Sequence, residues 1–482
     1  MSTIFDKIFT NIEEEKIAII EQDKKFTYKQ FKKDCEILYI QLKKIIGTKK
    51  KICICLPNTY LNVVIFIVSS KLKYTIFPLN TNISNKNFVN YSKKYNFDVI
   101  FLDNKNLKKS VKKILPNKII FNTNDIKKII NKNYSTETKV FYKINNNIVN
   151  HRYLIILSSG STGDPKPIIL SQKNKFLRSI YAGKTYNFKE NEVVILPYQL
   201  DHSVGQRLMF MSLIHKGTLV IAKNFNEKTW FNLSHKYAVT FSILVSFHIK
   251  NIFQKKINLN KLHMLKNLVS VSDVLEDKIR KKIIKYSFNF HEIYGAAEIS
   301  TVTNIKHRKN SQSKSVGKIL PFVDLKIISK DNKILKDGLV GEIVCKTPLM
   351  FEKYYKREKA TMKSFFKNYF KTGDLGYVRN NHLYFSGRIK NLIKISGLSI
   401  FPEDVENTLK KLKYINNCIV KAEYDSKRGQ KIVAIIEGNK KKENEIYFYC
   451  IKNLEIHQIP TKFYFTSNIP KTYLGKIDRK LT

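Results

Sequence analysis

A loop rich in glycines and hydroxyls is the most informative feature of the sequence. An apolar run from Tyr153 to Leu157 leads into Ser158-Ser159-Gly160-Ser161-Thr162-Gly163-Asp164-Pro165-Lys166. Small residues let backbone N–H groups close around phosphate oxygens, hydroxyls donate further hydrogen bonds, and the lysine adds a positive charge. The Gly-x-x-x-x-Gly-Lys spacing of the Walker motif is absent. The order of strand, loop and lysine therefore predicts a phosphate-binding loop of another type.

Four further short motifs carry residues suited to nucleotide chemistry. In chain order they are Tyr294-Gly295-Ala296-Ala297-Glu298, Thr372-Gly373-Asp374, Gly387-Arg388-Ile389-Lys390 and Pro470-Lys471-Thr472-Tyr473-Leu474-Gly475-Lys476. Taken singly, Gly and Asp in such motifs indicate ordinary turns. Together with the loop, and in this order, the motifs resemble those of the adenylate-forming superfamily, which contains acyl- and aryl-CoA ligases, peptide-synthetase adenylation domains and beetle luciferase. The resemblance runs from about Phe26 almost to the last residue.

The resemblance implies an acid–thiol ligase that uses ATP and Mg²⁺. A small carboxylic acid would become an acyl-adenylate and would then form a thioester with CoA or with the phosphopantetheine of an acyl carrier protein. Glu298 would hold Mg²⁺, a hard cation that prefers carboxylate and phosphate oxygens, and Thr162 would help to position the same ion. The expected phosphate-binding residues are Ser158, Ser159, Gly160, Ser161, Thr162, Gly163 and Lys166.

The nucleoside and the reacting groups have expected partners of their own. Tyr294, next to Gly295, offers a ring face for adenine, Asp374 can accept hydrogen bonds from both ribose hydroxyls, and Arg388 can brace ribose or phosphate. In the family, the lysine that corresponds to Lys476 bridges the substrate carboxylate and the α-phosphate as negative charge builds during attack. Lys476 is therefore the expected catalytic residue of the first half-reaction, together with Glu298 and Thr162.

The resemblance also implies two domains with the active site between them. Residues 1–388 would form the AMP-binding N-terminal domain and residues 389–482 a small mobile lid. Lys390 would be the hinge between them, because a few residues at a junction can absorb a large change in φ and ψ. Gly397, Pro402 and Glu406 match the start of the family's C-terminal domain.

The residues expected to line the acid pocket are His202, Gly205, Val271 and Ala296. Pro197, His202 and Gly205 resemble an element that lines the acyl pocket of acyl- and aryl-CoA ligases. Leu200-Asp201-His202-Ser203 also resembles the Phe-Asp-x-Ser of amino-acid-activating relatives, so both kinds of acid stay open. Ile400-Phe401-Pro402 is slightly more similar to CoA ligases, and the acceptor stays open as well.

Several positions depart from the family pattern. Ala297 replaces a threonine, and Val271-Ser272 stands where relatives have a pair of glycines beside the adenylate. Because only glycine permits close approach, Val271 is expected to narrow the pocket. Lys73 occupies a position where glycine is usual, and Gln172 one where histidine is common. A catalytically silent relative that binds ATP is therefore one alternative.

The periodicity of the apolar residues predicts the elements that position these motifs. Strands are expected at 51–56, 75–79 and 97–102, and helices at 28–42 and 60–72. Such alternation indicates an α/β fold with helices on the faces of the sheets. Short strands between residues 316 and 385 predict a β-rich subdomain, and mixed α+β structure follows, with a helix at 402–412 and a strand at 431–436. The Asn- and Lys-rich segment 122–138 is expected to be a solvated connection.

Charge and cysteines limit the remaining classes. The chain carries 87 basic and 39 acidic residues, a net charge of +48. This charge alone would suggest a nucleic-acid-binding protein, but the lysines are scattered, as an AT-biased genome would produce, and nucleic acid is not the expected partner. No stretch approaches the ~20 apolar residues of a membrane helix. The first residues lack the basic start and apolar core expected of a signal peptide, and the six cysteines form no metal or disulfide pattern. A cytoplasmic enzyme is expected.

Overall fold

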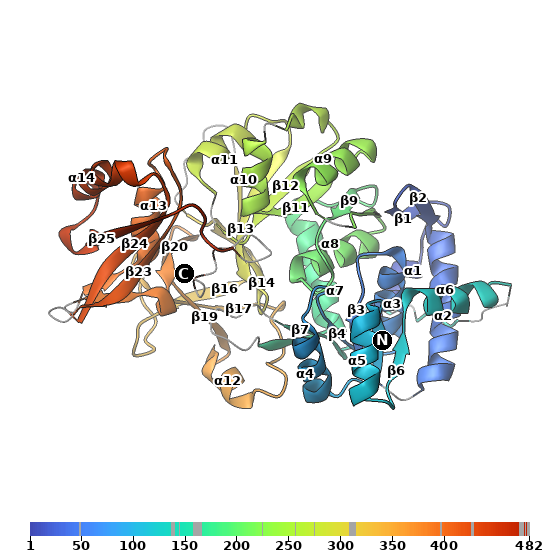
Figure 1. Ribbon diagram of the computed structural model, residues 1–482. Coiled ribbons are helices and arrows are strands. Elements are labelled where there is room, and N and C mark those ends of the chain that lie inside the picture. Colours follow the sequence, from blue (N-terminus) through green and yellow to red (C-terminus); the bar gives the residue numbers. More distant parts are fainter. Residues whose placement is uncertain are drawn as a thin grey trace.

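The computed structural model is shown in Figure 1. It describes residues 1–47, 50–135, 140–143, 145–157, 166–223, 225–255, 257–273, 275–307, 315–395, 398–425, 429–471, 477 and 479. The six-stranded sheet of the N-terminal residues lies at one end of the molecule, and the C-terminal elements, orange to red, lie at the other. None of the helices in these ranges combines the length and the apolar character needed to cross a lipid bilayer.

A six-stranded sheet forms first, with the order β6-β5-β3-β4-β7-β8 among the described residues. Its strands are β3 (Lys51–Cys55), β4 (Thr75–Pro78), β5 (Val99–Leu102), β6 (Ile119–Phe121), β7 (Arg152–Leu157) and β8 (Pro167–Ser171). All neighbours are parallel except β7 and β8, which are antiparallel. The strands predicted at 51–56, 75–79 and 97–102 are therefore confirmed. Their runs are continuously apolar because both faces of this sheet are buried.

Helices cover both faces of this sheet, as an α/β fold requires. Helices α4 (Asn85–Tyr95) and α5 (Lys105–Ile114) pack with the face that carries Cys53 and Cys55. The opposite face packs with α2 (Tyr28–Ile46) and α3 (Tyr60–Lys71). Both cysteines are buried and free and fill part of this core.

The expectation of a solvated connection at 122–138 is wrong for its first part. Residues Thr123–Lys132 form helix α6, and Asn122 caps it by accepting a hydrogen bond from the N–H of Asp125. Only Ile126 and Ile130 are buried, four residues apart on one face. Two apolar anchors among Asn and Lys are enough once α2 provides a surface to pack on.

A second, larger sheet carries most of the predicted motifs. Its main order is β16-β17-β19-β20-β15-β14-β13-β12-β11-β9-β10-β1-β2 in the described ranges. The parallel part consists of β1 (Ile17–Glu21), β10 (Thr218–Ile221), β9 (Val193–Leu196), β11 (Phe241–Val245), β12 (Asn267–Val271) and β13 (Asn289–Ala296), and β2 (Lys24–Thr27) is antiparallel to β1. The helices of this region are α1 (Ile4–Phe9), α7 (Gln172–Tyr186), α8 (Ser203–Ile214), α9 (Glu227–Lys236), α10 (Ser246–Gln254) and α11 (Asp277–Ile283).

The antiparallel part of the same sheet contains the predicted β-rich region and begins one strand before it. Its strands are β14 (Ser300–His307), β15 (Lys318–Ile319), β16 (Asp324–Ile328), β17 (Gly341–Lys346), β18 (Phe365–Phe366), β19 (Tyr369–Arg379) and β20 (His382–Arg388). One short helix, α12 (Glu358–Lys363), interrupts them. The sheet is thus continuous from the parallel α/β part into the antiparallel part.

The C-terminal residues build a small unit with a core of its own. Its elements are the hairpin β21 (Ile393–Ile395) and β22 (Leu398–Ile400), helix α13 (Pro402–Leu409), strands β23 (Ile415–Asp425), β24 (Gly429–Gly438) and β25 (Lys462–Thr466), and helix α14 (Glu443–Asn453). Val405, Leu409, Val420 and Ile436 lie in a cluster separate from the large core. This mixed α+β unit has the composition predicted for the lid.

Candidate active site

The turn between β13 and β14 holds Glu298 in a fixed position. Ala296 pairs with Ser300 across the hairpin, and the backbone oxygen of Glu298 accepts a hydrogen bond of 2.6 Å from the N–H of Phe351. Arg178 of α7 donates a second hydrogen bond of 3.1 Å to the same oxygen. The carboxylate accepts from the Tyr354 hydroxyl at 3.0 Å. Backbone and side chain are thus held separately, which orients the carboxylate oxygens expected to bind Mg²⁺.

Lys166 reaches the same place from the end of the predicted phosphate loop. Its Nζ lies 4.8 Å from the centre of the Tyr354 ring, a cation–π distance. Tyr354 therefore contacts a cation through its ring and a carboxylate through its hydroxyl. Burial and the nearby Glu298 carboxylate raise the pKa of this hydroxyl, so it remains a hydrogen-bond donor.

The predicted nucleoside residues also meet. Asp374 of β19 and Arg388 of β20 are cross-strand partners, and Arg388 Nε lies 3.2 Å from Asp374 Oδ1. The Tyr294 hydroxyl donates to Asp374 Oδ2 at 2.8 Å. Gly373, with φ of 71°, takes the left-handed conformation that turns the chain before Asp374. Residues 80 positions apart are therefore joined around one buried carboxylate.

Lys390 lies in the short 3₁₀ helix Ile389–Asn391. Burial lowers its pKa, and the nearby cations Lys166 and Arg388 lower it further. Mutual repulsion among three cations is relieved when an anion lies between them. This cluster is consistent with a site for phosphate groups beside the ribose site.

Several predicted residues lie outside the described part of the chain. They are Ser158, Ser159, Gly160, Ser161, Thr162, Gly163, Gly397 and Lys476. The backbones of Lys471 and Ile477, which flank the segment of Lys476, pair in an isolated bridge. Lys471 Nζ lies 5.2 Å from the ring centre of Phe247 in α10. The chain thus contacts the large domain just before it reaches Lys476.

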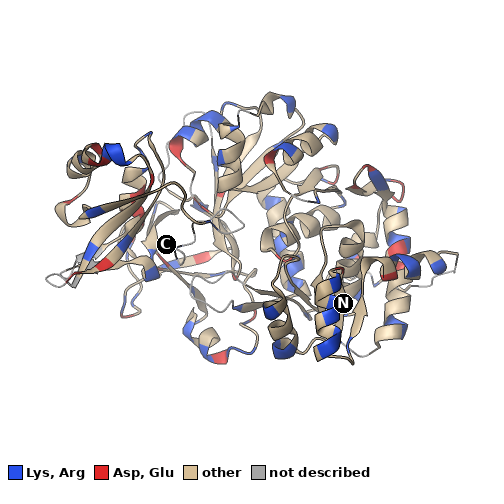
Figure 2. Cartoon of the chain, viewed as in Figure 1, with Lys and Arg blue, Asp and Glu red and all other residues tan. Residues whose placement is uncertain are grey.

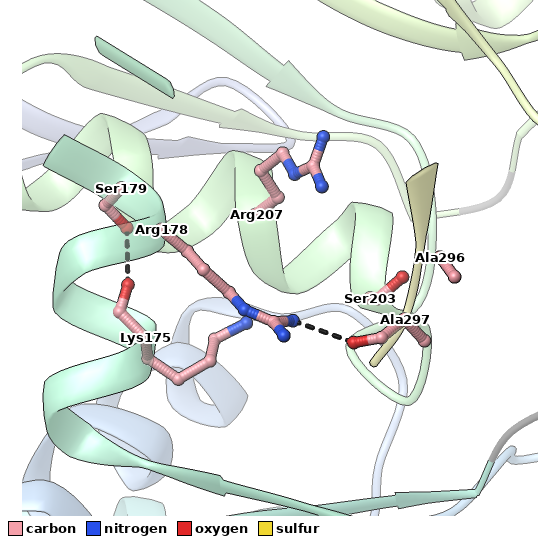
Figure 3. Close-up of a pocket in the computed structure, with 7 residues that line it drawn as sticks. All are labelled: Lys175, Arg178, Ser179, Ser203, Arg207, Ala296 and Ala297. Carbon is pink, nitrogen blue, oxygen red and sulfur yellow. Dashed lines mark hydrogen bonds between the residues drawn. The ribbon is translucent and has the colours of Figure 1, made fainter. Parts of the chain in front are cut away.

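The residues predicted to line the acid pocket occupy two strand ends and the start of α8. His202 is the N-cap residue of α8, and its Nε2 lies 3.6 Å from Asp201 Oδ2. A Cβ at Gly205 would lie 2.5 Å from the backbone oxygen of Gln199, so this glycine is required for close packing of α8. Val271 is buried at the end of β12. Of the four predicted pocket residues, Ala296 lines the described cavity shown in Figure 3.

Three of the positions that depart from the family pattern have distinct structural features. Lys73 and Ser272 adopt φ of 56° and 89°, in the left-handed region that glycine enters without strain. Gln172 accepts a hydrogen bond from the N–H of Ile4 and donates another to the backbone oxygen of Ser70. These bonds tie α1 and α3 to the start of α7, so Gln172 has a structural role.

The cavity in Figure 3 is lined by residues that sequence reasoning missed. The missed residues are Lys175, Arg178, Ser179, Ser203 and Arg207, which line the cavity together with the predicted Ala296 and its neighbour Ala297. The three cations resembled ordinary surface charge in a lysine-rich chain. One signal was present in the composition: only ten of the 87 basic residues are arginine, and two of these ten line this cavity.

Comparison with known proteins identifies the relatives of the chain. The family described as AMP-binding enzyme matches residues 9–355, and the AMP-binding enzyme C-terminal domain matches residues 404–476. A D-alanine–D-alanyl carrier protein ligase from Listeria monocytogenes is 29% identical over 356 residues, which cover 68% of this chain and 69% of that protein. An indoleacetate–CoA ligase from Aromatoleum aromaticum is 23% identical over 332 residues, covering 67% and 65% of the two chains.

A solved structure shares the fold. The o-succinylbenzoate CoA synthetase of Bacillus subtilis, in complex with ATP and magnesium ion, has a TM-score of 0.87 and 21% sequence identity, covering 99% of this chain and 98% of that one. The predicted fold class is therefore confirmed. The family match also confirms the predicted superfamily and the predicted adenylate-forming ligase function. The chain belongs to the family of AMP-binding enzymes.

Proposed function

We propose that the chain uses ATP and Mg²⁺ to activate a small carboxylic acid and then transfers the acyl group to a thiol. A carboxylate oxygen attacks the α-phosphorus, and the bond from this phosphorus to pyrophosphate breaks. The thiol sulfur then attacks the acyl carbon, AMP leaves, and the thiol proton passes to solvent. The observation that carries this proposal is the group of Tyr294, Asp374 and Arg388, which fixes a buried carboxylate for the ribose hydroxyls.

The nucleotide is held by residues of the large domain. Asp374 accepts from the ribose hydroxyls, and Arg388, whose side chain is 53% exposed, can turn between ribose and phosphate. Lys166 and the hydroxyls of residues 158–163 bind the phosphates. Glu298 and Thr162 would hold Mg²⁺, whose oxygen preference the Glu298 carboxylate fits, and the ion would neutralise phosphate charge.

Lys476 supplies the positive charge that bridges the carboxylate and the α-phosphate. The segment that bears it follows Lys471, which already contacts α10 of the large domain. We assign residues 1–388 to the AMP-binding domain and 389–482 to the lid, with Lys390 as the hinge. This assignment is supported by the separate core of the C-terminal elements.

The acceptor is CoA or a carrier-protein phosphopantetheine. One relative is a carrier protein ligase and another is a CoA ligase, so both thiols belong in the first assay. A carrier-dedicated enzyme would show thioester formation with the carrier protein alone. Measurement of thioester yield with both thiols, from one acid, separates the two.

A cytoplasmic location is supported by the cysteines. All six are buried and free, which suits a reducing compartment. Lysines and arginines occur on elements throughout the chain in Figure 2, rather than on a single stripe of the kind that nucleic acid requires. We therefore propose no nucleic-acid partner.

A screen of acid-dependent exchange of labelled pyrophosphate into ATP tests the proposed function. Fatty, aromatic, dicarboxylic and amino acids form the panel. We expect exchange that requires Mg²⁺ and one class of acid. ATP binding without exchange for any acid would identify a catalytically silent member, and salt-sensitive retention of DNA without turnover would favour the nucleic-acid alternative.

A further inference from the structure

Two helices direct an unusual set of polar side chains toward one cavity. Lys175, Arg178 and Ser179 lie at positions i, i+3 and i+4 of α7, and Ser203 and Arg207 lie at i and i+4 of α8. Residues with these spacings share a helix face. We call the cavity that they line together with Ala296 and Ala297 the cation pocket (Figure 3).

The cations of this pocket are withdrawn from solvent. Lys175 and Arg178 are 3% and 6% exposed, and Arg207 is half-buried. The inward face of α7, which would normally be apolar, is therefore polar and charged. Because an unpaired buried charge costs several kcal/mol, such an arrangement requires compensation.

The direct hydrogen-bond partners of these three cations are all neutral groups. Lys175 Nζ donates to Gln206 Oε1 at 3.1 Å. Arg178 donates to three backbone oxygens, those of Ala297, Glu298 and Leu349. Arg207 donates to the hydroxyls of Thr301 at 2.9 Å and Ser300 at 3.1 Å.

No carboxylate in the described ranges lies within 4.0 Å of a side-chain nitrogen of these three cations. The arrangement therefore hydrogen-bonds its donors without a direct ion pair in the described part of the chain.

Burial and mutual repulsion both oppose the charged forms. Burial lowers the pKa of Lys175 well below its usual value, and the neighbouring Arg178 and Arg207 lower it further. An anion placed in the pocket would oppose the lowered pKa of Lys175, because opposite charge favours the charged form of the amine.

We propose that the cation pocket receives a second carboxylate of the acid, so that the substrate is a short dicarboxylic acid; this inference rests on the proposed function. The pocket borders Ala296 and Ala297. In the sequence these two residues lie between Tyr294, which is proposed to contact the nucleoside, and Glu298, which is proposed to hold Mg²⁺. One carboxylate would react at the nucleotide while the other lies among the cations.

The size of the cation pocket and its positive charge limit the acid further. The cavity volume is about 10 Å³, room for about one water-sized group, so the cavity can receive one oxygen of a terminal carboxylate but no long apolar chain or aromatic ring. A pocket with three cations also repels the ammonium group of an amino acid. The alternative source of negative charge is a nucleotide phosphate, and the test separates the two.

Arg207 is the residue on which the test depends. Arg178 holds the turn of Glu298 through backbone hydrogen bonds, so its removal would disturb the metal site as well. Arg207 contacts two hydroxyls that can turn toward other partners. Its planar group can bind a carboxylate through two parallel hydrogen bonds, which makes it the proposed specificity residue.

The experiment compares malonate, succinate and glutarate with their monomethyl esters in acid-dependent pyrophosphate exchange. Each ester keeps one reacting carboxylate and most of the length of the acid but lacks the second charge. We expect kcat/KM for the preferred dicarboxylate to exceed that of its ester by about 100-fold. Equal or faster exchange with the ester, or with monocarboxylic acids generally, would overturn the inference while supporting the proposed function. Absence of exchange with every acid would refute the proposed function and the inference together.

Variants of Arg207 then test whether its positive charge recognises the second carboxylate. Arg207→Gln should lower kcat/KM for the dicarboxylate by about 100-fold and leave that of the ester and the KM for ATP unchanged. Arg207→Lys, which keeps the charge, should retain a preference for the dicarboxylate, and Arg379→Gln is the control for loss of an exposed arginine of β19. A rise in the KM for ATP with an unchanged ratio of acid to ester would show that the pocket serves nucleotide phosphate, which would refute the inference.

Discussion

Replacement of Glu298 by glutamine tests the proposed metal site with little disturbance of the fold. The backbone of Glu298 is held by Phe351 and Arg178, and these bonds do not involve the carboxylate. A glutamine amide has the same shape and its oxygen can still accept from the Tyr354 hydroxyl, which lies 3.0 Å from Glu298 Oε1. The main change is therefore the loss of one negative charge and one metal-binding oxygen.

The expected size of the effect follows from this change. A metal ion contributes several kcal/mol of charge stabilisation, and we assign about 3 kcal/mol to its carboxylate ligand. At about 1.4 kcal/mol per tenfold, kcat/KM should fall about 150-fold. Tyr354→Phe removes one hydrogen bond to the same carboxylate, worth about 1 kcal/mol, and should lower the rate only about fivefold.

The assay is pyrophosphate exchange at several Mg²⁺ concentrations, with thermal unfolding as the control for folding. Glu298→Gln should show a lower maximal rate and should require more Mg²⁺, with an unchanged melting temperature. Tyr354→Phe should keep the Mg²⁺ dependence of the natural protein. Exchange in Glu298→Gln at the natural rate, or an equal loss in both variants, would refute the assignment of this carboxylate to the metal.

Three further results are expected. Val271→Gly should broaden the range of accepted acids without changing the KM for ATP, because it enlarges the buried end of β12; an unchanged profile across an acid panel would remove Val271 from the pocket. Lys390→Pro should keep adenylation and lose thioester formation, because proline fixes φ near roughly −65° at the hinge; equal loss of both steps would argue against a rotating lid. Burial lowers the pKa of His291 from 6.5 to about 4, so below pH 6.5 the unfolded chain takes up a proton that the native state does not. The contribution of the neutral imidazole to the free energy of unfolding is therefore complete above pH 6.5 and is lost as the pH falls toward 4. Between pH 7 and 5 this loss is about 2 kcal/mol, and His291→Gln, which can still donate to Asn304, should unfold in urea with a weaker dependence on pH. An unchanged pH dependence of unfolding in His291→Gln would contradict the lowered pKa of His291.

Strands were easier to predict than polar helices. The runs that became β3, β4 and β5 are apolar on both faces because helices cover both sides of their sheet, and such runs can be recognised without a partner. Helix α6 was missed because its stability comes from the contact of Ile126 and Ile130 with the rest of the core. In the sequence these two residues stand among Asn and Lys, which are typical of loops.

The candidate site also has one part that the sequence predicts and one part that it does not. The resemblance identified Tyr294, Asp374 and Arg388, but their meeting depends on the register of β19 and β20 and on the order of strands, which local patterns do not determine. The cation pocket could not be predicted, because the buried Lys175 and the half-buried Arg207 came together only when α7 packed against α8. The rarity of arginine in this chain was the one available signal.

Acid-dependent pyrophosphate exchange by Lys476→Ala, compared with thioester formation by the same variant from a synthetic acyl-adenylate, tests the central claim most directly. If the chain forms an acyl-adenylate with Lys476 bridging carboxylate and α-phosphate, exchange should be lost by at least about 100-fold, an electrostatic effect of the size expected for one positioned donor. Conversion of the supplied adenylate to thioester should continue at the natural rate. Full exchange in Lys476→Ala would contradict the account.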